Sequence, residues 1–281
     1  MISLENYFLV VLALVWIIAA VVQDLRKREV ANWVNFSLIA IALSYRAFVS
    51  VWVLDYWYLV YGLIGFGIFF ALANAFYYGR VFAGGDAKLL MALGAVLPFS
   101  SSLFENLESF LYFIVFLMFA GSLWGLVYSL VLISKHKRQF SKEFSKQLHK
   151  NKTLVKVFII MAVLVFIFIL FVKQYIFSLF SLLVLLFPFL YVYAKSIEES
   201  CMIKSVRTQD LTIGDWLYKP VKIGKRTIKP NWEGLNEDEL KLLKKTKRKV
   251  LVKEGVPFTP SFLIAFIVLI WMLNNNLLNF I

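Results

Sequence analysis

The sequence is poor in the residues that bind metals or form cross-links. Its 281 residues include one cysteine, Cys201, and two histidines, His136 and His149. A single cysteine cannot form an intramolecular disulfide or a cysteine-rich zinc cluster. Both histidines lie in a charged segment, where solvated side chains are more common than metal ligands. The sequence therefore indicates neither a metal site nor a cofactor.

Acidic residues are also scarce, and apolar residues take up most of the chain. There are 17 Asp and Glu against 30 Lys and Arg, and 61% of the residues are hydrophobic, including 28 Phe. The mean hydropathy is +0.77, whereas soluble domains are nearer half apolar. This composition excludes an ordinary soluble domain and indicates an integral membrane protein. The first residues, MISLEN, carry no Lys or Arg, so we expect no cleavable signal peptide.

Long apolar runs predict the membrane topology. A helix needs about 20 apolar residues to cross a bilayer, and eight segments approach this length. They are 6–23, 33–54, 57–77, 87–102, 109–133, 154–172, 175–194 and 259–279. The fourth is short and contains Pro98, so six or seven spans remain alternatives. We therefore expect an all-α polytopic membrane protein built as a bundle of about eight transmembrane helices.

Basic residues gather in every second connecting segment. Of the 30 Lys and Arg, 27 lie in residues 24–32, 78–88, 134–153 and 195–258. The positive-inside rule places these segments in the cytoplasm and both termini outside. We interpret 134–153 as a basic cytoplasmic loop that touches anionic lipid, and no motif for nucleic-acid binding appears. Arg46 lies inside a span, where snorkelling and an interhelical pair are both open.

Residues 195–258 form the longest polar part of the chain. Apolar residues spaced between 212 and 232 predict a hairpin that turns near Gly224. The stretch 236–255 predicts a helix, with Asn236 as N-cap, Glu239 completing a capping box, and Gly255 as its end. We therefore expect a small cytosolic α+β insertion in the helical bundle.

Two aspartates sit where apolar runs meet basic segments. Asp24 lies in VVQDLRKREVANW and Asp86 in GRVFAGGDAKLLMALG. Each has an ordinary interpretation: Asp24 could pair with Arg26 or Arg28, and Asp86 could cap a helix. Both nevertheless fall on the cytoplasmic side, and ionisable residues at the membrane edge are functional candidates by default. Gly84 and Gly85, beside Asp86, would allow a loop to approach closely.

Two carboxyl groups in contact have a characteristic chemistry. They do not both ionise easily, so they share a proton, and burial raises the pKa of one of them. One carboxylate can then activate water while the other protonates a scissile carbonyl oxygen. This pattern predicts peptide hydrolysis without a metal or a covalent intermediate.

These segments resemble a known family. VVQDLRKREVANW and AGGDAKLLMALGAVLP are similar to the two aspartate motifs of the type IV prepilin and archaeal preflagellin peptidases, which are membrane aspartyl proteases of the GxGD class. The tail from LTIGDWL to SFLIAFIVL resembles archaeal members, so the resemblance covers roughly residues 5–100 and 205–275. One departure is Ala83, which stands where the family's first glycine would be.

The resemblance implies specific residues, substrates and location. Asp24 and Asp86 would be the catalytic pair, with Gly84 and Gly85 in the active-site loop. Substrates would be pilin or archaellin precursors, whose short basic leader is cut at the cytoplasmic face of the cell membrane. With Cys201 as the single cysteine and no methyl-donor motif, we expect peptidase activity and no methyltransferase activity.

The expected organisation has five parts. They are a catalytic transmembrane bundle (1–133), a basic cytoplasmic loop (134–153), a transmembrane hairpin (154–194), a soluble cytoplasmic region (195–258) and a C-terminal transmembrane helix (259–281).

Other functions compete with this interpretation. A proton- or cation-coupled transporter would also use membrane carboxylates, but it predicts carboxylates at mid-membrane and repeated halves, which the sequence lacks. A presenilin-like protease would carry Tyr-Asp and Pro-Ala-Leu motifs; here Gln23 precedes Asp24 and no Pro-Ala-Leu occurs. A scaffold without catalysis is the third alternative.

Overall fold

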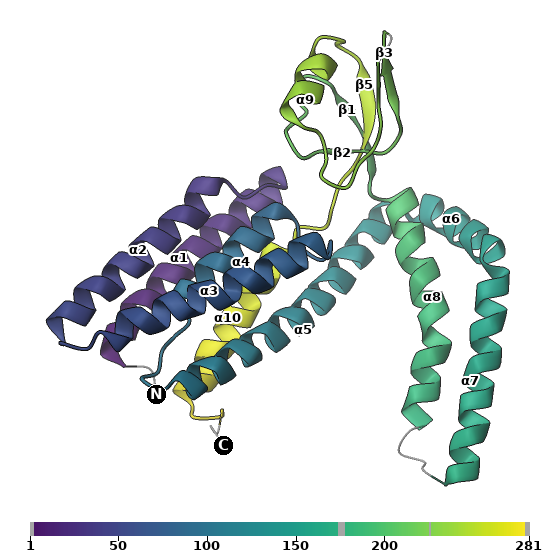
Figure 1. The fold of residues 1–281 in the computed structure, drawn as a ribbon. Coiled ribbons are helices and arrows are strands. Elements are labelled where there is room, and N and C mark those ends of the chain that lie inside the picture. Colours follow the sequence, from purple (N-terminus) through teal and green to yellow (C-terminus); the bar gives the residue numbers. More distant parts are fainter. Residues whose placement is uncertain (1–2, 174–177, 225, 279–281) are drawn as a thin grey trace. The chain divides into compact units, whose positions relative to one another are not determined.

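A computed structural model describes residues 3–173, 178–224 and 226–278, and most of its regular structure is helical (Figure 1). The chain divides into two compact units. The first contains residues 1–127 and 256–281, and the second contains residues 128–255.

The first unit is a helical bundle. Its helices are α1 (Leu4–Lys27), α2 (Asn32–Trp52), α3 (Trp57–Tyr78), α4 (Gly84–Val96), α10 (Thr259–Asn274) and most of α5 (Leu103–Lys135). Helix α4 packs against α1, α2 and α3, and α10 packs against α1. Because α4 is surrounded, nearly all of its residues from Ala87 to Val96 are buried.

Small residues let α3 and α4 approach each other closely. A Cβ atom added to Gly65 on α3 would collide with the Gly94 carbonyl oxygen and with Pro98. One added to Gly94 would collide with Phe69 and with the Gly65 carbonyl oxygen. The backbones can therefore meet only because both positions lack a side chain, as is common between membrane helices.

Arg46 on α2 is fully buried and binds the end of α4. Its guanidinium donates hydrogen bonds to the carbonyl oxygens of Ala95 at 2.8 Å and Val96 at 2.9 Å, and to that of Pro98. These carbonyl groups lie at or just past the C-terminus of α4, where backbone acceptors lack helical partners and a positive charge is favoured. The question left by the sequence is answered: Arg46 joins two helices through backbone carbonyls.

Six helices are long and apolar enough to cross a membrane: α1, α2, α3, α5, α7 and α8. This confirms a polytopic helical membrane protein, while the expected number of eight is not confirmed. The segments expected at 87–102 and 259–279 form the shorter helices α4, with 13 residues, and α10, with 16. Residues 175–177 and 279, which belonged to two expected spans, lie outside the described residues.

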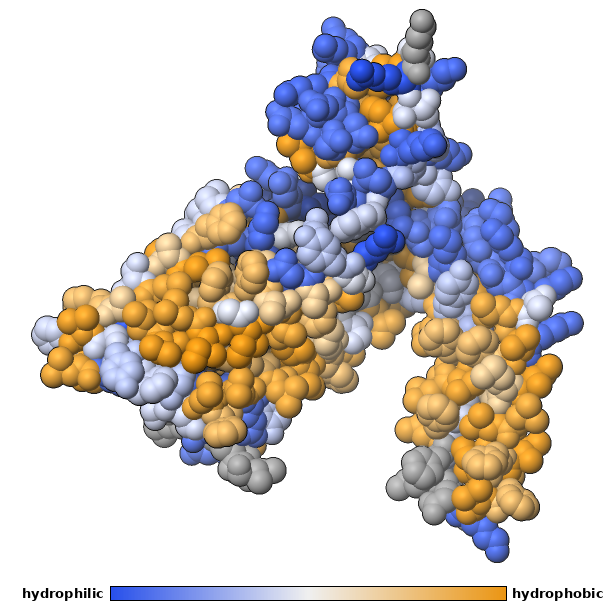
Figure 2. Space-filling view, viewed as in Figure 1, coloured by the Kyte–Doolittle hydropathy of each residue, from blue (hydrophilic) through white to orange (hydrophobic). Residues whose placement is uncertain are grey.

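The second unit combines helices with a small sheet region. Its helices are α6 (Lys137–Lys150), α7 (Lys152–Val172), α8 (Ser178–Ser200) and α9 (Glu237–Lys244). Within this unit, α7 and α8 present mainly hydrophobic residues and α6 presents hydrophilic ones (Figure 2). The segment expected as a basic loop is therefore largely helical. Its Phe140 ring contacts Tyr193 on α8 and the Phe144 ring on α6 itself.

The sheet region confirms part of the expected α+β insertion. Strands β1 (Ile203–Arg207), β5 (Lys249–Lys253) and β2 (Trp216–Leu217) form an antiparallel sheet in the order β1-β5-β2. Strands β3 (Val221–Ile223) and β4 (Arg226–Ile228) form the expected hairpin around Gly224, which has a φ of +57°. Lys225 lies outside the described residues.

The prediction of a helix over 236–255 is correct only for the first half of this stretch. Asn236 and Glu239 form the expected capping box, and Glu237 pairs with Lys241 at 2.8 Å. The helix ends at Lys244, however, and Gly255 is not its end. Residues 249–253 form β5, because Val250 and Val252 alternate into the core of the unit and the branched valines favour a strand.

Candidate functional site

Asp24 lies one turn before the end of α1 and is only 7% exposed. The helix ends at Lys27 because Arg28 adopts a left-handed conformation, with φ of 59°, and its N–H bonds the Asp24 carbonyl oxygen. The Asp24 carboxylate oxygen Oδ2 accepts two hydrogen bonds from Thr259, one from the backbone N–H at 3.2 Å and one from the hydroxyl at 2.9 Å. In the described part of the chain, neither Arg26 nor Arg28 forms a salt bridge with this carboxylate.

Asp86 lies in the first turn of α4 and is 8% exposed. The extended residue Ala83 is the N-cap, so Asp86 is the third helical residue and not the cap. Gly84 and Gly85, expected in a loop, are instead the first two residues of the helix. The Asp86 carboxylate reaches back to the Ala83 backbone, as the third residue does in a capping box, and this contact favours a helix that starts at Gly84.

The two motif segments lie against each other. A Cβ atom added at Gly85 would lie 3.4 Å from the Val30 Cβ, so the start of α4 contacts the turn between α1 and α2. Lys88 on α4 donates to the Asn32 side-chain oxygen at 2.6 Å. Within the turn, the Gln23 side chain accepts the Ala31 N–H at 2.9 Å. These contacts fix the position of Asp86 relative to the end of α1.

The carboxyl groups of Asp24 and Asp86 influence each other electrostatically. Asp86 lies outside the six candidate spans and precedes the expected span 87–102. Burial raises the pKa of its carboxyl to about 7, the negative charge of Asp24 contributes to the rise, and the hydrogen bond from Ala83 opposes it. A carboxyl with this pKa can hold or release a proton near neutral pH, as general acid–base chemistry requires.

Thr259 was not singled out by the sequence. It lies between Pro257 and Pro260 at the start of an apolar run, which is a recognisable helix start. Nothing in that pattern indicates that its hydroxyl reaches a carboxylate 235 residues earlier in the chain.

Other carboxylates outside the pair have separate partners. The Asp55 side chain accepts the Trp57 N–H at 3.0 Å at the start of α3. Asp210, in the second unit, forms a surface ion pair with Arg207 at 2.8 Å. Among the described residues, no group of three or more His, Cys, Asp or Glu side chains could hold a metal ion.

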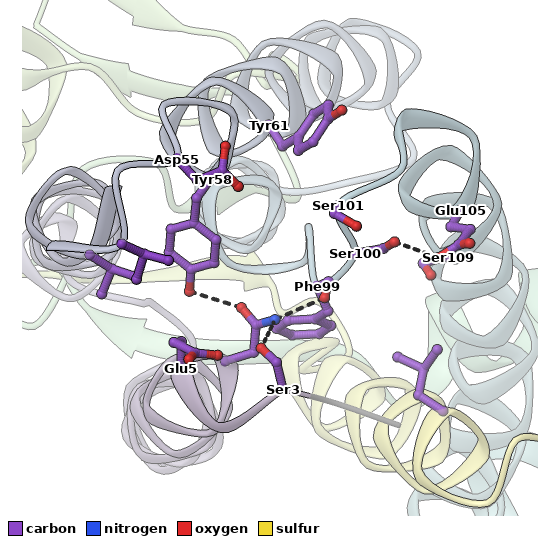
Figure 3. A pocket seen from close by; sticks show the side chains of 14 residues that line it. Ser3, Glu5, Asp55, Tyr58, Tyr61, Phe99, Ser100, Ser101, Glu105 and Ser109 are labelled. Atoms are coloured by element: carbon purple, nitrogen blue, oxygen red, sulfur yellow. Dashed lines mark hydrogen bonds between the residues drawn. The ribbon is translucent and has the colours of Figure 1, made fainter. Parts of the chain in front are cut away.

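The first unit also contains a cavity of about 400 Å³. Glu5, Asp55, Glu105 and several hydroxyl groups line it, and the Tyr58 hydroxyl bonds Asn6 across it (Figure 3). Glu5 and Asp24 are 19 residues apart on the same helix, which corresponds to roughly 28 Å along its axis. The cavity is therefore at the end of the bundle away from the two aspartates.

Comparisons with known proteins agree with the two motifs. Residues 11–130 match the Type IV leader peptidase family. A preflagellin peptidase of Methanococcus maripaludis is 32% identical over 96 residues, which cover 34% of this chain and 41% of that protein. A preflagellin peptidase of Methanocaldococcus jannaschii is 33% identical over 82 residues, covering 29% of this chain and 35% of that protein. Each match thus spans less than half of the relative, and the resemblance expected from the sequence is confirmed.

Proposed function

Because residues 11–130 match the Type IV leader peptidase family, we propose that this chain is an aspartic endopeptidase that removes leader peptides from precursor proteins at the membrane. The observation that carries the proposal is the pair of buried, electrostatically coupled carboxyl groups of Asp24 and Asp86 inside the matched segment. The names of the two relatives favour archaellin precursors as substrates, and pilin-like precursors have the same chemistry.

The proposed reaction uses the two aspartates as one unit. One carboxylate takes a proton from a water molecule while the water oxygen forms a bond to the scissile carbonyl carbon. The other carboxyl gives its proton to the carbonyl oxygen. When the carbon–nitrogen bond breaks, the amine leaves with the proton of the first aspartate, and one hydroxyl of the tetrahedral intermediate gives its proton to the second aspartate as the new carboxyl product forms. Both aspartates then return to their starting state. No cofactor takes part, and we expect no methyl transfer.

The proposal also includes an orientation in the cell membrane. We infer that the end of the bundle with Asp24 and Asp86 faces the cytoplasm, because the adjoining segments carry the basic residues. Residues 87–102 and 259–279, the expected spans that contain most of α4 and α10, would be two further membrane segments, which brings the number of segments to eight. The basic residues around α6 would contact anionic lipid, and no nucleic acid would bind.

The five expected parts keep their boundaries in this proposal. Residues 1–133 would form the catalytic bundle, and 134–153 the basic cytoplasmic segment. The remaining parts would be a transmembrane hairpin (154–194), a soluble cytoplasmic region (195–258) and a terminal membrane helix (259–281).

The test is cleavage by purified protein, followed by mass analysis of the new N-terminus of a prearchaellin or prepilin substrate. Asp24→Asn and Asp86→Asn should each lower kcat by roughly a thousandfold or more, and the double variant should be little worse, since the two residues act as a unit. Asparagine keeps the shape of the side chain, so folding should be retained.

Asp210→Asn is the matched control, because Asp210 forms only a surface ion pair. It should cleave at the wild-type rate. A folded Asp86→Asn protein with normal cleavage would refute the two-aspartate mechanism. Ion transport by a wild-type protein that cleaves no precursor would favour a transporter instead.

A further inference from the structure

The two aspartates differ in their hydrogen-bond donors. Asp24 Oδ2 accepts both the N–H and the hydroxyl of Thr259, and donors of this kind stabilise the ionised form of a carboxyl group. In the described part of the chain, no side chain donates a hydrogen bond to Asp86, whose carboxyl is hydrogen-bonded to the Ala83 backbone.

The start of α10 strengthens this difference. Thr259 is the first residue of α10, and the N-terminus of a helix carries a partial positive charge that favours an anion. Pro260 follows and has no N–H group, and the Ser261 N–H bonds the Phe258 carbonyl oxygen at 3.0 Å. The Thr259 N–H is therefore the donor at this helix end that is directed to Asp24.

The residues before Thr259 are held in place by α5 and by the segment before α4. The Trp124 ring N–H donates to the Pro257 carbonyl oxygen at 2.8 Å. The Phe258 ring packs on Gly121, where an added Cβ atom would collide with it. The same ring lies 5.1 Å from the ring of Phe82, four residues before Asp86. Thr259, the donor to Asp24, thus follows a residue that packs against Phe82 in the segment before Asp86.

We propose that Thr259 is a positioning residue that keeps Asp24 as the ionised member of the pair, so that Asp24 is the base toward water and Asp86 carries the proton. Because both bonds from Thr259 go to Oδ2, the second oxygen of Asp24 stays available to accept a proton from water. The raised pKa of Asp86 agrees with this division. The inference rests on the proposed function and adds to it the role of each aspartate.

The test compares the cleavage kinetics of Thr259→Val and Thr259→Ser. Valine keeps the shape and removes the hydroxyl donor, whereas serine keeps the hydroxyl. A hydrogen bond to a charged group corresponds to about a ten- to hundredfold effect. Thr259→Val should therefore lower kcat by about that factor with KM nearly unchanged, and Thr259→Ser should restore kcat to near the wild-type value. Thr259→Ala gives the same comparison if the valine variant does not fold.

Ser261→Ala is the matched control on the same turn of α10. The Ser261 hydroxyl is buried and has no hydrogen-bond partner in the described structure, so its removal should leave kcat unchanged. A wild-type kcat in Thr259→Val would overturn the positioning role. So would a loss of kcat in both Ser261→Ala and Thr259→Ser that is as large as the loss in Thr259→Val. A different result would show that the proposed function itself is wrong: normal cleavage by the Asp24→Asn variant.

Discussion

At the scale of single residues, two identical side chains have different surroundings. Asp24 is near the end of one helix and accepts two donors from the start of another. Asp86 is in the first turn of its own helix and is 8% exposed. Environment separates the protonation of two carboxyl groups in this way in many acid–base pairs.

The pKa of Asp86 predicts a pH dependence. If Asp86 must be protonated to donate to the carbonyl oxygen, activity falls as pH rises through about 7, the pKa of its buried carboxyl. Steady-state kcat measured from about pH 5 to about pH 9 should therefore decrease on the alkaline side, with a midpoint that belongs to the pair as a whole. A rate that stays constant on the alkaline side would show that no protonated carboxyl is needed.

The sequence singles out the two aspartates as candidates but not the residues that contact them. Asp24 and Asp86 were visible because a carboxylate beside an apolar run is unusual. Arg46 was also visible as an unexplained charge, yet its partners are backbone carbonyl oxygens, which every residue has. Thr259 is a common residue whose partner is 235 positions away. Contacts of these kinds leave no local pattern.

At the scale of elements, the position of Asp86 depends on how α4 fits into the bundle. The helix has 13 residues, and nearly all of those from Ala87 to Val96 are buried. Its end is bound by Arg46, and its contact with α3 depends on Gly65 and Gly94. A shift of α4 would therefore move Asp86 relative to Asp24.

Substitution of Gly65 by alanine should disturb this contact. The new Cβ atom would meet the backbone oxygen of Gly94 and the ring of Pro98, which cannot move aside easily. Overpacking of this kind costs about 1–3 kcal/mol, so thermal unfolding in detergent should show a lower apparent Tm and cleavage should decrease. Gly67→Ala is the control on the same helix, because nothing lies within 4 Å of its new Cβ atom. Equal Tm values for the two variants would contradict close packing at Gly65.

Sequence patterns predicted elements well where one physical requirement dominates. Apolar length predicted the long membrane helices, and Asn236 with Glu239 predicted the start of α9. The pattern failed at 245–255, where helix-forming lysines surround the alternating valines of β5. That strand pairs with β1, more than 40 residues earlier, so its conformation depends on a partner that the local sequence does not contain.

At the scale of the whole molecule, apolar helices alternate along the chain with basic connecting segments. The ends of α5 and α7 meet at α6, whose exposed faces are basic, and both helices are candidate membrane spans. Crossing helices joined by a short amphipathic helix place that helix at a membrane surface. The 27 basic residues in alternate connections favour the cytoplasmic surface, which is the side where a short cytoplasmic leader would be cut.

This orientation predicts the accessibility of two exposed serines. Ser141 lies on α6, and Ser101 lies between α4 and α5, at the opposite end of the α5 span. Each is replaced by cysteine in a Cys201→Ser background, so that the introduced thiol is the single one in the chain. In intact cells a membrane-impermeant maleimide should label Ser101→Cys and leave Ser141→Cys unlabelled until the membrane is opened. The reverse pattern would place the basic segments and the two aspartates outside, where a cytoplasmic leader could not reach them.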